Sequence, residues 1–284
     1  MSIVVTGATG NLGRHVIEGL LEKVPADQIT AVARSEEKAA DYAARGVKIA
    51  VADYSAPETF DNVFSAGDKV LLISGSEIGN DRVGQHKAVL EAAKAAGVAR
   101  LAYTSAPGSL TAALADDHRG TEAAILESGV TYTLLRNGWY HENYTENLAP
   151  VLEHGAVVQA AGEGRVSSAS RADYAAAAVA VLTGEGHENK TYELGGDTAW
   201  SFAEYAAEVA KQSGKEIAYS PVSVEVFTGI LTGVGLPEPV AATIAGVDVS
   251  VEKGELVVTS GDLSRLTGRP TTPIADSIAA ALKG

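Results

Sequence analysis

The chain has 284 residues, of which 20% are charged and 46% belong to the hydrophobic set, a balance typical of an ordinary globular protein. Lysine and arginine number 22 against 36 aspartates and glutamates, and the resulting net charge of −14 repels nucleic-acid phosphates and anionic membrane surfaces, so neither is expected as a partner. The absence of cysteine excludes disulfides, thiolate nucleophiles and iron–sulfur clusters, and the six scattered histidines predict no metal site.

The first half of the chain alternates short β-branched runs with longer amphipathic segments, which is the pattern of βαβ units and a parallel sheet. Strands are expected at residues 3–5, 28–33, 47–52, 70–74, 101–104 and 131–135. Between the first two strands, every fourth residue from Leu12 to Val24 is apolar, which predicts a helix that ends before Pro25. Gly97 and Gly129 follow helical segments and are expected to cap them in the left-handed conformation.

The rhythm changes after residue 136. An alanine-rich helix is expected over 174–182 and a further strand over 191–194, and Ser201 with Glu204 predicts a capping box that opens a helix running to Ser213. We therefore predict an α/β fold with a doubly wound parallel sheet and a smaller, mostly helical C-terminal domain. The first domain is expected over 1–136, with its sheet completed by segments within 155–196. The second part is expected over 137–284, mostly 197–284.

The strongest local signal is the glycine loop from Thr6 to Gly13, T-G-A-T-G-N-L-G, which follows the first strand and opens the first helix. Gly7 permits a tight turn, Gly10 lets the backbone approach a pyrophosphate, and Gly13 lets the helix pack against the strand. The first amides of the helix would face the anion. The spacing G-x-x-G-x-x-G departs from the dehydrogenase fingerprint, and a plain backbone role for the glycines is the alternative. The flanking strand and helix favour a dinucleotide.

The end of the second strand indicates which dinucleotide. An acidic residue there would accept hydrogen bonds from a ribose 2′-hydroxyl, but the chain has Arg34, whose guanidinium suits a 2′-phosphate. This favours NADPH as the cofactor. The alternative is a solvent-exposed arginine whose charge Glu36 and Glu37 partly offset.

Two later strand ends are further candidates, because ligands of open α/β sheets bind outside the carboxyl ends of the strands. Ser74, Gly75 and Ser76 end the fourth strand, where the glycine permits close approach to the dinucleotide. Asp53 and Tyr54 end the third strand, near the expected adenine. At both places a plain turn is the alternative.

The pair that catalyses carbonyl reduction in short-chain dehydrogenases, Tyr-x-x-x-Lys, is missing, since no tyrosine in the chain has a lysine four positions later. By register from Glu122 and Gly129, the two sites hold Leu114 and His118. A ketone is a poor hydride acceptor until its oxygen is protonated or polarised, so ordinary carbonyl reduction is disfavoured. A quinone is a better expected acceptor, because hydride transfer makes its ring aromatic and leaves positioning as the main catalytic task.

The chain resembles the NmrA-like group of atypical short-chain dehydrogenases, and most of all the bacterial NAD(P)H:quinone oxidoreductases of type 2. The resemblance rests on the glycine loop and on segments 71–74, 102–105, 132–140, 170–174, 192–194, 234–237 and 267–272. It implies a Rossmann-like domain, a smaller C-terminal domain, NADPH in the cleft, and direct hydride transfer to a small-molecule quinone without flavin or metal.

The resemblance also implies a set of site residues. Asn137 would anchor the nicotinamide or the quinone, and Tyr140 would act with it as the second catalytic residue. Tyr140 and Trp139 would cover the ring, although an aromatic pair is often ordinary core. The implied cofactor contacts are Gly7, Ala8, Thr9, Gly10, Asn11, Leu12, Arg34, Ser74, Gly75, Ser76, Asn137, Gly138, Trp139, Tyr140, His141, Glu142, Ser168, Ala169, Ser170, Arg171, Ala172, Asp173 and Tyr174.

Two of these residues need a separate comment. His141 stands where a smaller polar residue is expected, and Arg171 would reach a phosphate or form a structural salt bridge with Asp173.

Other functions remain open at this level. Related reductases act on other electron-poor conjugated compounds such as triphenylmethane dyes, and NmrA itself is a regulator that senses a dinucleotide and does no chemistry. The N-terminal apolar run is too short for a secretory signal, and the run 227–236 is far shorter than the roughly 20 residues of a spanning helix. We therefore expect a cytoplasmic protein, with a homodimer as the candidate assembly.

Overall fold

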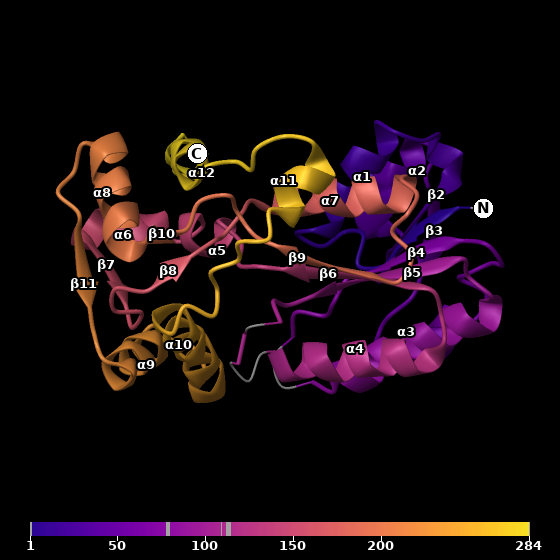
Figure 1. Cartoon of the computed structure of the whole chain (residues 1–284), viewed down its shortest axis with the longest axis horizontal. Helices are drawn as coiled ribbons and strands as arrows, with labels where there is room; N and C mark the ends of the chain where they lie inside the picture. Colours follow the sequence, from indigo (N-terminus) through magenta and orange to yellow (C-terminus); the bar gives the residue numbers. More distant parts are fainter. Residues whose placement is uncertain (1, 78–79, 109, 112–114, 284) are drawn as a thin grey trace. The chain divides into compact units, whose positions relative to one another are not determined.

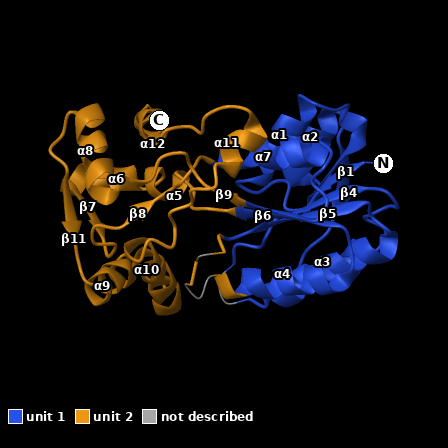
Figure 2. Cartoon of the chain, viewed as in Figure 1, with its two compact units in different colours: residues 1–106, 117–136, 171–192 blue, residues 107–116, 137–170, 193–284 orange. Residues whose placement is uncertain are grey.

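The computed structural model describes residues 2–77, 80–108, 110–111 and 115–283. The chain divides into two compact units (Figure 2). Unit 1 contains residues 1–106, 117–136 and 171–192, and unit 2 contains residues 107–116, 137–170 and 193–284. One division between the units falls after residue 136. The segment 107–116 lies in unit 2, however, and the segment 171–192 returns to unit 1.

A seven-stranded sheet forms the centre of the fold, in the order β3-β2-β1-β4-β5-β6-β9. The strands are β1 (Ile3–Val5), β2 (Ile29–Ala33), β3 (Lys48–Val51), β4 (Lys69–Leu72), β5 (Arg100–Ser105), β6 (Tyr132–Asn137) and β9 (Lys190–Leu194). The pairs from β3 to β6 are parallel, with Ile3 opposite both Ile29 and Lys69. Strand order reverses between β1 and β4, and such a switch point is where doubly wound sheets bind ligands. The predicted Rossmann-like α/β fold is confirmed.

Helices cover both faces of this sheet (Figure 1). On one face lie α1 (Gly13–Leu21), α2 (Ala40–Ala44) and α7 (Arg171–Thr183), and on the other lie α3 (Arg82–Ala96) and α4 (Asp116–Ser128). Three short 3-10 helices, η1 (Ala26–Gln28), η2 (Glu37–Ala39) and η3 (Pro57–Phe60), follow β1 to β3. Because both faces are covered, β4 and β5 are buried along their whole length, as in other parallel sheets.

One core of unit 1 lies between the sheet and α3 and α4. Val89 and Leu90 of α3 and Ile125 of α4 pack on β-strand residues including Leu72 and Leu101, all fully or almost fully buried. On the opposite face α1 packs closely on α7. A Cβ atom added to Gly19 of α1 would lie 3.0 Å from the Val179 side chain of α7, so the small residue permits this approach.

The helix ends predicted from single residues are confirmed. Gly97 and Gly129 have φ values of +72° and +76°, the left-handed conformation in which glycine carries no steric cost. In unit 2 the Ser201 side chain accepts from the Glu204 amide and the Glu204 carboxylate accepts from the Ser201 amide, so the capping box is complete. The helix that it opens, α8 (Phe202–Ser213), ends before Gly214 as expected.

Unit 2 contains small sheets as well as helices. Its helices are α5 (Glu142–Thr145), α6 (Leu148–His154), α8, α9 (Val224–Gly233), α10 (Glu238–Glu252), α11 (Asp262–Thr267) and α12 (Ile274–Leu282). Strand β7 (Ala156–Gln159) pairs in parallel with β11 (Ala218–Pro221), and β8 (Arg165–Val166) pairs antiparallel with β10 (Trp200–Ser201).

The expectation that segments within 155–196 complete the main sheet therefore holds for β9 only. Strands β7 and β8 form separate two-stranded sheets because their partners, β11 and β10, come from later in unit 2. No helix in the described part of the chain is both long and apolar enough to span a membrane.

Candidate functional site

The glycine loop closes on its own backbone. Gly7 has a φ of +62°, and the Gly10 amide donates to the Gly7 carbonyl oxygen at 3.0 Å. A Cβ atom on Gly13 would lie 2.2 Å from the same Gly7 oxygen and 2.8 Å from two backbone atoms of Ala8. Any side chain at residue 13 would therefore displace the turn, and the predicted roles of the first and third glycines have a direct steric basis.

Buried polar groups hold this turn against the switch point of the sheet. The Ile73 amide donates to Thr6 Oγ1 at 3.2 Å, and the Tyr54 hydroxyl donates to the Ile73 carbonyl at 2.7 Å. Thr6 Oγ1 and the Tyr54 oxygen lie 2.5 Å apart. Burial raises the pKa of Tyr54, so the ring stays neutral. Tyr54, expected beside the adenine, thus uses its hydroxyl to join the ends of β1 and β4.

The start of α1 is arranged to receive an anion. Leu12 occupies the N-cap position and supplies no side-chain acceptor, whereas Gly10 and Asn11 beside it are exposed. The amides at the start of a helix lack intrahelical acceptors and carry the positive end of its dipole. Ala8 is buried, and its amide is held by the Val32 carbonyl at 3.1 Å, so the loop itself is fixed. Together with half-buried Thr9, these residues fit a diphosphate.

Arg34 lies directly after β2 with its side chain 63% exposed. Its Nη1 atom is 3.4 Å from the Glu77 Oε1 atom, an ion pair on the surface of unit 1. The guanidinium is therefore open to a second anion at the strand end where the sequence predicts a 2′-phosphate. A planar, permanently charged donor of this kind fits a phosphate dianion.

The loop after β4 is anchored by its amides. The Ser74 amide donates to Thr104 Oγ1 at 2.9 Å, and the Gly75 amide donates to His86 Nε2 at 2.9 Å, while Ser76 is exposed. The other ring nitrogen, His86 Nδ1, lies 2.9 Å from Thr121 Oγ1, whose hydroxyl donates to the Asp117 carbonyl at 2.8 Å. This network assigns the ring proton to Nδ1.

The His86 ring is fully buried, and burial together with the nearby Arg82 charge lowers its pKa to about 4. A neutral ring is the form that accepts from the Gly75 amide. His86 is not among the residues predicted for the site, because its only signal in the sequence is a polar residue on the apolar side of α3.

His118 occupies the register position of the dehydrogenase lysine, but its surroundings do not suit acid–base catalysis. Its Nδ1 atom lies 2.9 Å from the Tyr103 oxygen, and its Nε2 atom lies 3.3 Å from Nη2 of Arg82, which forms an ion pair with Asp117. Burial and the Arg82 charge lower the pKa of His118 to about 3. The partner position, Leu114, lies outside the described residues. Within the described ranges, no group of three or more His, Cys, Asp or Glu could hold a metal ion.

In unit 2, Asn137 presents an unpaired buried acceptor. It is the last residue of β6 and is 6% exposed, and its Nδ2 atom donates to the Tyr140 oxygen at 3.4 Å. Its Oδ1 atom is buried without a hydrogen-bond partner. A buried polar atom of this kind normally finds a partner, so the carboxamide suits a ligand that donates a hydrogen bond. The nicotinamide carboxamide has such a donor.

The segments 137–142 and 168–170 come together in unit 2. Tyr140 pairs with Ala169 as a parallel bridge, and the Ala169 amide donates to the Trp139 carbonyl at 3.1 Å. The Gly138 amide donates to Leu194 in β9, and Glu142 begins α5. These contacts fix the backbone around Asn137. Residues 171–174 begin α7 in unit 1, where Arg171, Asp173 and Tyr174 are buried and Ala172 is exposed.

The His141 ring has a structural role in unit 2. The side chain is 1% exposed, with Nε2 3.0 Å from the Ser168 carbonyl and Nδ1 2.9 Å from Ser277 Oγ of α12. Trp200 Nε1 donates to Ser168 Oγ at 2.9 Å, which secures the same segment from another side. Ser170 is buried as well. The His141 ring thus joins α12 to residue 168.

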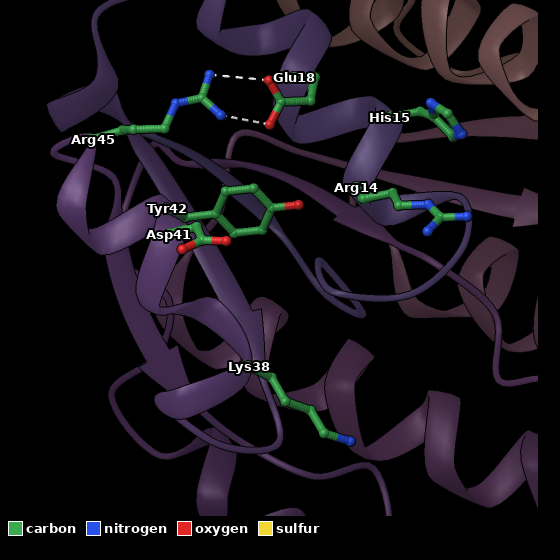
Figure 3. Close-up of a pocket in the computed structure, with 7 residues that line it drawn as sticks. All are labelled: Arg14, His15, Glu18, Lys38, Asp41, Tyr42 and Arg45. Carbon is green, nitrogen blue, oxygen red and sulfur yellow. Dashed lines mark hydrogen bonds and ion pairs between the residues drawn. The ribbon is translucent and has the colours of Figure 1, made fainter.

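A separate hollow of about 370 Å³ lies on unit 1 (Figure 3). The Arg45 guanidinium faces the Glu18 carboxylate across it, with two contacts of 2.6 and 3.0 Å. The hollow is lined by Arg14, His15, Glu18, Lys38, Asp41, Tyr42 and Arg45. None of these is a predicted cofactor residue. The paired charges indicate a structural link between α1 and the end of α2.

Comparisons with known proteins agree with this geometry. A family model described as NAD(P)H-binding matches residues 7–185. The chain is 48% identical over 278 residues to quinone oxidoreductase 2 of Escherichia coli (strain K12), covering 97% of each chain. It is similar to the crystal structure of the NADPH-dependent quinone oxidoreductase from Escherichia coli complexed with NADPH, with a TM-score of 0.95, 48% identity and 99% coverage of each chain. The Citrobacter sp. triphenylmethane reductase complexed with NADP(H) gives a TM-score of 0.94 at 42% identity, over 99% of this chain and 100% of that one.

Proposed function

The chain belongs to the NAD(P)H-binding family, and from this membership we propose that it is an NADPH-dependent reductase that transfers a hydride directly to a quinone, without flavin or metal. The observation that supports direct hydride transfer is the environment of His118. A buried, neutral imidazole held by Arg82 does not donate a proton to a carbonyl oxygen. The acceptor is therefore one that takes a hydride before it takes a proton, as a quinone does.

The residues of each unit have distinct parts in holding the cofactor. In unit 1, the turn from Gly7 to Leu12 and the start of α1 would hold the diphosphate, and Arg34 would hold the 2′-phosphate. Ser74 to Ser76 would approach the dinucleotide through a backbone fixed by Thr104 and His86. In unit 2, Asn137 Oδ1 would accept from the nicotinamide carboxamide.

NADPH, when bound, supplies the hydride. The protein's own contribution is to orient the reactants and to exclude water, which suffices for an acceptor that needs no prior protonation. Asn137 is held at the end of β6, with its side-chain nitrogen on the Tyr140 hydroxyl. The Tyr140 hydroxyl would donate a hydrogen bond to the quinone oxygen on which charge develops. Solvent supplies the protons of the hydroquinone.

The test is NADPH oxidation with and without 1,4-benzoquinone, in protein shown to contain no flavin. Single-turnover reduction with 4-deuterated NADPH should show a primary isotope effect, and its absence while chemistry limits the rate would contradict direct transfer. The variant Arg34→Ala should weaken NADPH binding by about tenfold or more and leave NADH binding unchanged, because a charged hydrogen bond to the phosphate is lost. Asn137→Ala should lower the rate of the hydride step.

A second candidate substrate class is supported by the similarity to the Citrobacter triphenylmethane reductase. Triphenylmethane dyes, like quinones, accept a hydride at an electron-poor conjugated centre. A panel of both classes compared by kcat/KM distinguishes them. A dinucleotide sensor without chemistry would instead bind NADPH tightly and leave it unoxidised whichever acceptor is added. A cytoplasmic location and a homodimer belong to the same proposal, and light scattering of the purified protein tests the assembly.

A further inference from the structure

Arg34 already has an anionic partner inside unit 1. Glu77 lies in the loop after β4, and its Oε1 atom is 3.4 Å from Arg34 Nη1. Both side chains are 63% exposed, so water and ligands reach the pair. The carboxylate therefore competes for the guanidinium on which the expected 2′-phosphate depends.

The Glu77 carboxylate is also held from its other side. Asn80 Nδ2 donates to Glu77 Oε2 at 2.6 Å, so one oxygen faces Arg34 and the other faces the amide. This arrangement leaves fewer rotamers for Glu77 and favours the pair with Arg34. The two other carboxylates close in sequence to Arg34, those of Glu36 and Glu37, are exposed and have no ion pair with it among the described residues.

We propose that Glu77 weakens the preference of this protein for NADPH over NADH by competing with the 2′-phosphate of NADPH for Arg34. The inference rests on the proposed role of Arg34 as the phosphate-binding residue. A 2′-phosphate carries close to two negative charges, and to reach the guanidinium it must displace or approach the Glu77 carboxylate. Both processes weaken the binding of NADPH. NADH has no 2′-phosphate, so its binding leaves the ion pair intact.

The expected change in NADP⁺ affinity follows from the exposure of the ion pair. Exposed ion pairs are weak, and removing one competitor of this kind corresponds to about a two- to fivefold change in affinity. The variant Glu77→Gln should therefore bind NADP⁺ about two- to fivefold more tightly than the wild type, whereas its affinity for NAD⁺ should change by less than about twofold. Asn80→Ala, which releases the carboxylate, should shift NADP⁺ binding in the same direction by a smaller factor.

The experiment is calorimetric titration of the full chain with NADP⁺ and NAD⁺ at low ionic strength. The matched control is Glu37→Gln, which removes the same charge close to Arg34 in sequence but breaks no ion pair. The double variant Arg34→Ala/Glu77→Gln completes a mutant cycle. If Glu77 acts through Arg34, the gain from Glu77→Gln should disappear when Arg34 is alanine, and high salt should reduce it.

The outcomes separate this inference from the function on which it rests. If Arg34→Ala leaves NADP⁺ affinity unchanged, the proposed phosphate site is wrong. If Arg34→Ala weakens NADP⁺ binding but Glu77→Gln has no effect or weakens it, only the competition is wrong. An equal gain from Glu37→Gln, or a gain that persists without Arg34, would also overturn it, because the cause would then be general charge.

Discussion

Replacing His86 by leucine tests whether the loop after β4 positions the cofactor. The substitution keeps an apolar side chain of similar size in a fully buried place but removes the acceptor of the Gly75 amide, now 2.9 Å from Nε2. Leaving a partly buried donor without a partner costs about 1 to 2 kcal/mol, which corresponds to about 5- to 30-fold in an equilibrium constant. If the loop must keep its position to bind NADPH, most of this cost should be measured as weaker binding.

The assay is steady-state oxidation of NADPH at saturating quinone, together with calorimetric binding of NADP⁺. We expect the KM for NADPH to rise by about tenfold with kcat changed by less than about twofold, because His86 contacts the loop and no reacting atom. His86→Gln should recover part of the loss, since its amide oxygen can accept near the position of Nε2. Recovery by glutamine would not follow from a general loss of packing.

The matched control is His118→Leu. His118 is 9% exposed and belongs to the same polar network through Tyr103, but its ring nitrogens lie against Arg82 and Tyr103 and not against residues 74–76. It should lower stability and leave both KM and kcat close to those of the wild type. Equal effects of the two leucine variants on KM, or an unchanged KM in His86→Leu, would refute the positioning role. A large loss of kcat in His118→Leu would show that this histidine takes part in the chemistry.

Two further predictions concern the glycine loop and a buried carboxyl of unit 2. Gly13→Ala should reduce NADPH affinity, measured by calorimetry, by more than about tenfold, because the added carbon would lie 2.2 Å from the Gly7 oxygen. Gly19→Ala is the control with a milder expected effect, because its added carbon would meet the Val179 side chain and no backbone atom. Asp248 accepts from the Ala160 amide at 2.7 Å, and burial raises its pKa from 3.8 to about 7. Between these values the folded chain holds a proton that the unfolded chain has released, so its contribution to stability is complete below about pH 4 and is lost as pH rises to about 7. Asp248→Asn should remove this loss, and the wild-type free energy of unfolding should fall relative to the variant by up to about 1.4 kcal/mol per pH unit in that window. The prediction would be contradicted if the free energy of unfolding of the two proteins changed in parallel with pH.

The strands of the main sheet could be located from the sequence because each is a short run that contains β-branched or apolar residues, followed by a turn, a helical segment or a glycine. The predicted strand at 70–74 begins one residue later and ends two residues later than β4, a small difference since strand ends carry no sharp signal. Strands β8 and β10 were missed. Each has two residues and pairs with a segment more than thirty residues away, so no local period could reveal them.

The site could be predicted only where a backbone requirement fixes the residue type. The steric demand at Gly13 is visible in the spacing of the loop, and the exposed place of Arg34 follows from the end of β2. The network around His86 was missed, because Thr121 lies 35 residues further along and reaches it only after α3 and α4 pack on the same face of the sheet. The sequence likewise could not show that Glu77 reaches Arg34 from the end of another strand.

Unit 1 is assembled from segments that are far apart in the sequence, and this has a consequence while the chain is being synthesised. When residue 136 has left the ribosome, the glycine loop is complete, but α7 and β9 are still to come. The nascent chain then carries an uncovered α1 surface at Gly19 and an unpaired edge on β6, both of which invite association with other chains. Unit 1 becomes complete only after about two thirds of the protein has been translated, so the surfaces that α7 and β9 later cover stay exposed until then.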